Sequence, residues 1–255
     1  MAAQRHLRDP EQLAQLPILG EAIVKRPITN AIADKIAGLI ASGILQVGDA
    51  LPSERELSVT LNVSRDAVRG GIRILAAQGI LEISQGARTR VARADVGSVT
   101  VGFATARAID AYDLDAVHAA RLLVERQVVS DAAGRIDARR LAVLEQLLAA
   151  QKAALDDPVR FLISDREFHV AIYQASSNRL LADFSTDLYA YMMEYRREAV
   201  ARPGAIATSY ADHVAIVDAL KAHDGEATAA AFAVHTGRIY ATTHLLMQGD
   251  AARGD

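Results

Sequence analysis

The sequence contains no cysteine and no tryptophan. Without cysteine, disulfide bonds and thiolate metal sites are excluded, so any metal ion must be bound by histidine and carboxylate side chains. No stretch approaches the roughly 18 uninterrupted apolar residues of a membrane-spanning helix. The opening residues, MAAQRHLRDP, contain no apolar segment of the kind found in secretory signal peptides. We therefore expect a cytoplasmic protein that does not enter a membrane.

Aromatic residues are scarce, at 5% of the 255 residues, although 51% of the chain is hydrophobic. That fraction is enough for a packed core, and the length is comfortable for two domains. The distribution of charge also divides the chain into two parts. From Lys25 to Arg93 there are ten Lys and Arg against six acidic residues, a net charge of +4, whereas the whole chain has −3 and the remainder therefore −7. A basic segment beside a larger acidic one suits contact with a polyanion, although an incidental basic surface gives the same count.

Three short helices are predicted within the basic segment. Residues 28–45, ITNAIADKIAGLIASGIL, have isoleucine and leucine at helical spacing. Ser53 and Glu56 form a capping box, which starts a second helix at Ser53. Ser64 offers the N-cap of a third helix that runs to about Gln78. Because only a few residues separate the last two helices, the pattern predicts a helix-turn-helix.

A β-hairpin is predicted directly after these helices. In ILEISQGARTRVA, residues 80–92, β-branched runs lie on either side of Gln85-Gly86. The second strand presents Arg88 and Arg90, and we expect Arg88 to contact DNA phosphates. A hairpin in this position makes the module a winged helix-turn-helix.

Arg65, Arg69 and Arg73 are four residues apart and therefore lie on one face of the third helix. The major groove admits an α-helix, and arginine binds guanine through two hydrogen bonds or contacts phosphate. Because the first turns of such a helix go deepest, Arg65 and Arg69 are the predicted base readers. A stripe of arginines is also typical of an ordinary solvated face. The capping box, the tight turn and the basic wing together favour DNA binding.

Residues 48–81, GDALPSERELSVTLNVSRDAVRGGIRILAAQGIL, resemble the N-terminal signature of the GntR family of bacterial transcription regulators. The chain departs from that signature at Val47, where proline is usual, and at Gly70-Gly71, where Glu-Ala is common. Two glycines cost about 1 kcal/mol each relative to alanine, which predicts a softer recognition helix. The wing also lacks the usual second glycine. The resemblance implies DNA contacts at Arg55, Ser64, Arg65, Arg69 and the wing-tip Gly86.

From about Asp95 onward strand signals are nearly absent, and the chain is expected to be helical. The fold class is therefore mainly α: an N-terminal winged helix-turn-helix followed by an all-helical bundle of six to seven helices. We predict a tail over residues 1–24, a DNA-binding domain over 25–93, and an effector-binding and dimerisation domain over 94–255. The expected helices are 97–110, 113–134, 138–155, 158–176, 179–201, 207–223 and 226–247.

Histidines in the bundle predict a metal site. Asp165 and His169 are at i and i+4 on one helix face. His213 lies eleven residues before Asp224 and His235 eleven after it, so an antiparallel hairpin places both at the same height. Three imidazoles and one carboxylate from three helices then converge on a site for Zn²⁺ or a similar divalent ion. Ordinary buried or solvated histidines are the alternative.

The segments DREFH, YADHVAIVDAL and AFAVHTGRI resemble the FCD-type effector domain of the FadR-like branch of the GntR family. This resemblance implies a divalent metal, with Zn as first choice and Ni or Mn as alternatives. The implied ligands are Asp165, His169, His213 and His235.

RLLVE, with Arg121 and Glu125, is similar to the Arg and Glu of the early helix in that branch. A guanidinium binds a carboxylate through two hydrogen bonds, and a metal with open positions binds the same ligand's oxygens. The resemblance therefore implies a small organic or sugar acid as effector, bound in part by Arg121. The alternative for these two residues is a simple i,i+4 ion pair.

Taken together, these features predict a ligand-responsive transcription regulator that binds operator DNA as a homodimer and acts as a repressor. Paired half-sites about one helical turn apart raise affinity and specificity. Two other classes are compatible with parts of the pattern. Three His and one Asp also describe hydrolytic zinc, although no HExxH motif or glutamate base accompanies them, and we expect no enzyme. An effector-independent DNA-binding protein is the other alternative.

Overall fold

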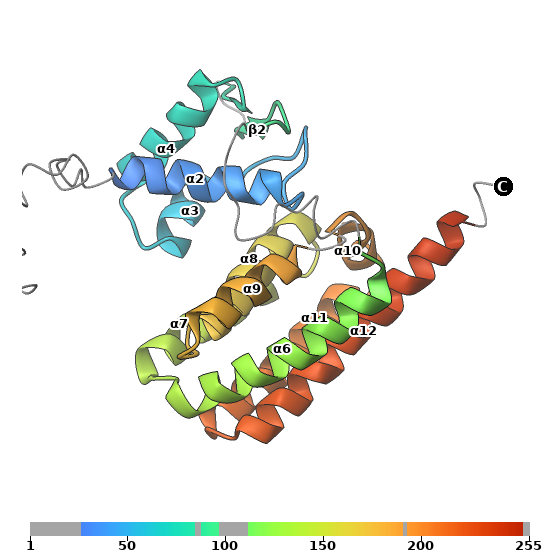
Figure 1. The fold of residues 1–255 in the computed structure, drawn as a ribbon. Coiled ribbons are helices and arrows are strands. Elements are labelled where there is room, and N and C mark those ends of the chain that lie inside the picture. Colours follow the sequence, from blue (N-terminus) through green and yellow to red (C-terminus); the bar gives the residue numbers. More distant parts are fainter. Residues whose placement is uncertain (1–26, 85–87, 97–111, 191–192, 252–255) are drawn as a thin grey trace, which may run out of the picture.

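The computed structural model describes residues 27–84, 88–96, 112–190 and 193–251 (Figure 1). Three short helices and a hairpin form the N-terminal part, which lies against one end of a bundle of longer helices. The predicted fold class, a winged helix-turn-helix followed by a helical bundle, is therefore confirmed. The predicted tail, the wing tip with Gly86 and the expected helix 97–110 lie outside the described residues.

The N-terminal helices begin where the capping residues predict. Ser53 Oγ accepts from the backbone N–H of Glu56, whose carboxylate in turn accepts from Ser53 N–H at 2.7 Å. Ser64 caps the third helix through the N–H of Ala67. Asn62 between the two helices adopts a left-handed φ of 51°, which makes the turn tight. The helices are α2 (Ile28–Ala41), α3 (Glu54–Thr60) and α4 (Arg65–Ala77).

Helices α2 and α4 approach each other closely at two glycines of α4. A Cβ atom on Gly71 would lie 2.7 Å from Cγ2 of Ile32, and one on Gly70 would lie 2.6 Å from Cγ2 of Thr29. The sequence pattern presented these glycines as a weakness of the helix. The structure gives them a packing role, because a larger residue at either position would collide with Thr29 or Ile32 of α2.

The wing is a short antiparallel hairpin. Strand β1 (Leu81–Glu82) pairs with β2 (Arg90–Val91), with Leu81 opposite Val91 and Glu82 opposite Arg90. Arg90 donates to the carbonyl of Gly48 at 2.6 Å, so this arginine supports the wing. Arg88 lies just before β2 and is exposed.

Helix α8 lies inside the bundle, because nine of its sixteen residues are buried and none is exposed. In Figure 1, α6 and α12 run side by side along the bundle, with α11 next to α12. Phe168, Ile172 and Tyr173 of α8 pack with Ile216 and Phe232 in one apolar core. The helices are α6 (Leu114–Arg135), α7 (Ala138–Lys152), α8 (Pro158–Tyr173), α9 (Arg179–Tyr189), α10 (Met193–Val200), α11 (Ala205–Lys221) and α12 (Gly225–Ala251).

The single helix predicted over 179–201 is wrong, because the chain forms two helices there. Helix α9 ends at Tyr189 and α10 begins at Met193. The side chain of Arg196 reaches back and donates to the carbonyl of Tyr189 at 2.8 Å, so it satisfies an acceptor at the end of α9. No glycine or proline marks this break in the sequence.

The N-terminal part and the bundle share apolar and ionic contacts. Leu162 and Ile163 of α8 belong to the same buried cluster as the core of α2 and α4. Lys35 pairs with Glu167 at 2.5 Å, and Arg160 pairs with Glu56 at 3.0 Å. The helix at the centre of the bundle therefore also touches the helix-turn-helix. Among the described helices, none combines the length and apolar character that crossing a bilayer requires.

Candidate metal centre and nucleic-acid interface

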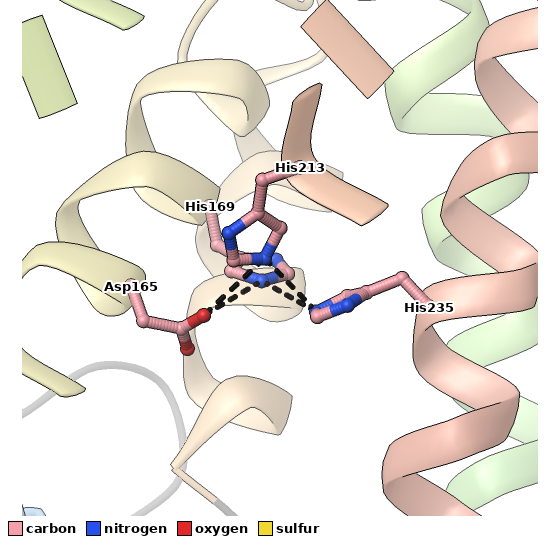
Figure 2. A group of neighbouring side chains, drawn as sticks. All are labelled: Asp165, His169, His213 and His235. Atoms are coloured by element: carbon pink, nitrogen blue, oxygen red, sulfur yellow. Dashed lines mark hydrogen bonds and ion pairs between the residues drawn. The ribbon is translucent and has the colours of Figure 1, made fainter. Parts of the chain in front are cut away.

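Four side chains from three helices converge in the bundle (Figure 2). Helix α8 supplies Asp165 and His169, α11 supplies His213 and α12 supplies His235. These are the four residues that the sequence grouped, and their potential ligand atoms all lie within 4.8 Å of one another. The Nε2 atom of His235 is 3.2 Å from those of both other histidines. Asp165 Oδ1 is 3.3 Å from Nε2 of His213 and 3.8 Å from that of His169.

These separations fit a single divalent ion. Ligand atoms about 2.0–2.1 Å from a tetrahedral ion lie about 3.3–3.4 Å from their neighbours. Three imidazole nitrogens and one carboxylate oxygen are donors that zinc accepts, and imidazole also suits nickel. All four side chains are buried, so water does not compete freely for these donors.

The protonation of the imidazoles also suits metal binding. Burial lowers the pKa of His169 and of His213 well below the ordinary value, and the neighbouring His235 lowers both further. Both rings are therefore neutral at neutral pH. A neutral imidazole is the form that binds a metal ion.

Each imidazole has a second contact on its Nδ1 side. Nδ1 of His213 lies 2.8 Å from Oε1 of the buried Gln151. An amide oxygen only accepts, so the proton of His213 is on Nδ1 and the lone pair of Nε2 points to the other ligands. Asp212 Oδ2 lies 3.6 Å from Nδ1 of His235. The hydroxyl of Tyr173 lies 3.4 Å from Nδ1 of His169.

Asp165 is held from the side opposite the histidines. Its Oδ2 accepts a hydrogen bond from the Tyr189 hydroxyl and lies 3.2 Å from Nη2 of Arg196. Burial raises the pKa of Tyr189, and the Asp165 carboxylate raises it further, so this phenol stays protonated and donates. Sequence patterns identified neither partner. Arg196 sits in a run of two arginines without diagnostic spacing, and only the fold brings it to the site.

A cavity of about 500 Å³ reaches the candidate metal centre at Asp165, the one of the four residues that lines it. This volume is within the roughly 300–1,000 Å³ of small-molecule sites. Asp165 and Arg196 line it, and so does Asp212, which pairs with Arg238 at 2.7 Å. Its other polar lining residues are Arg202, Thr208, Ser209, Arg238 and Thr242.

Arg121, the arginine expected to bind the effector, is buried in α6 and pairs with Glu125 at 2.9 Å. Glu125 also accepts from the Tyr173 hydroxyl at 2.7 Å, which links this pair to His169. Burial alone lowers the pKa of Arg121, but the Glu125 carboxylate reverses this and raises it. Arg121 lines a second, much smaller cavity of about 20 Å³, and Arg196 lines both cavities.

The predicted DNA-binding face lies on α4. Arg65, Arg69 and Arg73 are exposed along one side, as their spacing predicts. The opposite side buries Val68, Ile72 and Leu75 against the rest of the helix-turn-helix. Arg55, Ser64 and Arg88 are exposed as well. One acidic residue that sequence patterns did not single out, Glu54, binds directly to Arg69.

Comparisons with known proteins agree with both parts of the structure. Residues 28–91 match the profile described as bacterial regulatory proteins, gntR family, and residues 116–238 match the FCD domain. Over 250 residues the chain is 28% identical to the HTH-type transcriptional repressor NanR of Edwardsiella tarda, covering 93% of this chain and 95% of that protein. The NanR repressor of Citrobacter rodentium is 28% identical over 242 residues, covering 91% and 93%.

Among solved structures, the chain is similar in fold to E. coli McbR/YncC, with a TM-score of 0.53 and 21% sequence identity. The match covers 88% of this chain and 100% of that one. Similarity in sequence and in fold therefore extends over both the helix-turn-helix and the bundle.

Proposed function

The chain belongs to the GntR family of bacterial transcription regulators and carries an FCD domain, and from this we propose that it is a repressor controlled by a small organic or sugar acid. It is a DNA-binding regulator and not an enzyme. We propose the domain limits 25–93 for operator binding and 94–255 for effector binding and dimerisation. It acts in the cytoplasm, where operator DNA is found.

The DNA-binding proposal rests on the exposed face of α4. Inserted in the major groove, this helix presents Arg65 and Arg69 to base edges. Arg55, Ser64 and Arg88 contact the phosphate backbone, and Gly86, which lies outside the described residues, is a further proposed DNA contact. Phosphate contacts fix the position of the helix, whereas the arginines on α4 select the sequence.

One observation carries the effector proposal: the 500 Å³ cavity is lined both by Asp165, one of the four candidate ligands, and by Arg196, which contacts Asp165. The site fits Zn²⁺, with Ni²⁺ or Mn²⁺ as alternatives. A bound metal supplies a Lewis acid for carboxylate oxygens. Arg196 adds a guanidinium that can bind the same acid group through two hydrogen bonds. Arg121 is proposed as a further effector contact because it shares the smaller cavity with Arg196, although its guanidinium is paired with Glu125 and does not line the larger cavity.

Two neighbouring arginines connect this cavity to the DNA-binding part. Arg196 contacts Asp165 and the cavity, whereas Arg197 pairs with Asp49 at 3.0 Å and donates to the carbonyl of Ile44. Both arginines belong to the short helix α10. An acid that repositions Arg196 therefore repositions α10, and with it the contacts that hold the helix-turn-helix. This gives the effector different affinities for two placements of the wing, as regulation requires.

We further propose that the protein is a homodimer through α6 and α9, which pack side by side. Leu123 of α6 is 76% exposed, and Leu180 and Phe184 of α9 are 60% and 37% exposed. Large apolar side chains on neighbouring helices are typical of a contact with another protein surface. A second copy is the occupant that the function requires, because two recognition helices read paired half-sites.

A thermal-shift screen of organic and sugar acids, with and without Zn²⁺, Ni²⁺ or Mn²⁺, tests the function. We expect an acid that raises the melting temperature only when metal is present, and that changes the affinity for a DNA site selected from random duplexes. The His213→Ala variant is expected to lose both responses, because the site loses a ligand and its geometry. An acid that acts equally on this variant would contradict the metal-dependent site. Metal-dependent hydrolysis of esters or phosphates would favour the enzyme alternative.

A further inference from the structure

Glu54 lies among the arginines of the DNA-binding face. It is the first residue of α3, yet its carboxylate reaches α4 and binds the guanidinium of Arg69. Nη2 of Arg69 donates to Oε2 at 2.7 Å, and Nε donates to Oε1 at 3.1 Å and to Oε2 at 3.2 Å. An acid in this place weakens the attraction to DNA phosphates. Its position in the first turn of α3 favours that helix, but does not account for the contact with Arg69.

The contact occupies one edge of the guanidinium. With Nε and Nη2 both bound to Glu54, the orientation of the planar group is fixed. Nη1 contacts only Asp66 among the described residues, at 3.3 Å, and the Asp66 side chain is 92% exposed. The edge made of Nη1 and the second hydrogen of Nη2 is therefore available to a base once DNA displaces Asp66.

Glu54 is ionised at neutral pH. The hydrogen bonds from Arg69 lower the pKa of Glu54, and the positive charges of Arg73 and Arg65 lower it further. The same pair raises the pKa of Arg69. Both partners stay charged, and the pair does not open by titration near neutral pH.

We propose that Glu54 is a positioning residue that sets the base specificity of this regulator by holding Arg69 with its free edge toward the floor of the major groove. That edge matches the O6 and N7 acceptors of guanine. An arginine without this support is a long flexible chain that also reaches phosphates, which carry no sequence information. Glu54 thus lowers general affinity for DNA and increases discrimination. This inference rests on the proposed DNA-binding function.

The test compares Glu54→Gln with Asp66→Asn. Each substitution removes one negative charge next to Arg69, but only Glu54 holds two of its nitrogens. Sites are selected from random-sequence duplexes with the full-length protein and its variants. The position that loses its guanine preference in Arg69→Ala identifies the base that Arg69 reads.

At that position, Glu54→Gln is expected to reduce the preference for guanine at least about fivefold, since one such contact gives about 5- to 150-fold discrimination. Asp66→Asn is expected to keep the preference. Both variants should bind a non-cognate duplex more tightly than the wild type, because each loses one repulsive charge. In the Arg69→Ala background, Glu54→Gln should change the preference no further.

Three outcomes overturn the inference: Glu54→Gln selects the wild-type motif with undiminished preference, Asp66→Asn loses the preference equally, or Arg69→Ala changes no position. Unfolding does not mimic the expected result, because the tighter non-cognate binding of Glu54→Gln requires a folded helix-turn-helix. If the wild type itself selects no motif, the proposed function fails, and the inference fails with it.

Discussion

A single buried amide orients one ligand of the candidate metal centre. Gln151 is fully buried, its Oε1 accepts from His213, and its Nε2 has no hydrogen-bond partner among the described residues. Among the described residues, the only side-chain hydrogen bond of Gln151 is therefore the one that orients the His213 imidazole. Partners of metal-binding histidines typically raise metal affinity by fixing the ring and its tautomer.

We expect Gln151→Leu to lower the affinity for Zn²⁺ about 10- to 100-fold without unfolding the protein. Leucine keeps most of the volume, but it leaves Nδ1 of His213 without an acceptor. Competition of the purified protein with a chelating dye measures the affinity. Ser185→Ala is the matched control, since Ser185 Oγ is also buried without a partner in the described part of the chain and lies outside the four ligands. Equal metal affinity in Gln151→Leu and wild type would contradict this role.

Sequence patterns identify the four candidate metal ligands but not the residues that contact them. Asp165 and His169 are found from their spacing on one helix, and His213 and His235 from their symmetry about a turn. Gln151 and Arg196 come from other helices, and their contacts depend on how α7 and α10 pack against the site. Tertiary packing of this kind has no local periodicity, so a single sequence does not show it.

At the scale of helices, the pair of glycines in α4 decides how closely α2 can pack. Gly71 has no room for a Cβ atom, since Ile32 Cγ2 would lie 2.7 Å from it and the carbonyl of Thr29 3.0 Å from it. Gly38 lies on the other helix of the same pair, and a Cβ there would meet no atom within 4 Å. Alanine at Gly38 therefore tests helix propensity alone, whereas alanine at Gly71 also tests the packing between α2 and α4.

We expect Gly71→Ala to lower the free energy of unfolding by about 1–3 kcal/mol, because the added methyl group forces α2 and α4 apart. Gly38→Ala is expected to raise it by up to about 1 kcal/mol, because alanine is the better helix former and fits without strain. Urea unfolding followed by circular dichroism measures both changes. Destabilisation by both substitutions, or by neither, would contradict the packing role of Gly71.

Helix boundaries were predictable where the sequence carries caps. Ser53, Ser64 and the turn at Asp224-Gly225 all mark ends that the structure retains. The break between α9 and α10 was not predictable, because no glycine, proline or capping pattern marks it in the sequence. The hydrogen bond from Arg196 to the carbonyl of Tyr189, which joins the two helices, is visible only in the structure.

At the scale of the whole molecule, α8 and α10 each contact both the candidate metal centre or its cavity and the helix-turn-helix. Helix α8 carries two of the four ligands and contributes Leu162 and Ile163 to the core of the helix-turn-helix. Helix α10 contacts the candidate cavity through Arg196 and the DNA-binding part through Arg197. Neither half is therefore mechanically independent of the other.

We expect Arg197→Ala to weaken the response of operator binding to the effector acid while retaining metal and acid binding. Allosteric effectors typically change affinity about 5- to 150-fold. In this variant the ratio of the operator affinities with and without the acid should fall toward one. Titrating the selected operator with and without the acid found by thermal shift measures it. Arg126→Ala is the control, because Arg126 forms an exposed pair with Glu226 within the bundle. A wild-type ratio in Arg197→Ala would place the coupling elsewhere, for example at the Arg160–Glu56 pair.

The positions of the candidate ligands along the chain also determine when the candidate metal centre is completed during synthesis on the ribosome. His169 and His235 are 66 residues apart, and α3 and α4 precede every ligand. At about 5–20 residues per second, a ribosome needs roughly 3–13 s to pass from one histidine to the other. The helix-turn-helix is thus synthesised first, its core is completed as α8 to α10 emerge, and the four candidate ligands are all present only once α12 has been made. Each new molecule therefore passes through a period in which the proposed DNA-reading residues exist but the candidate metal centre does not.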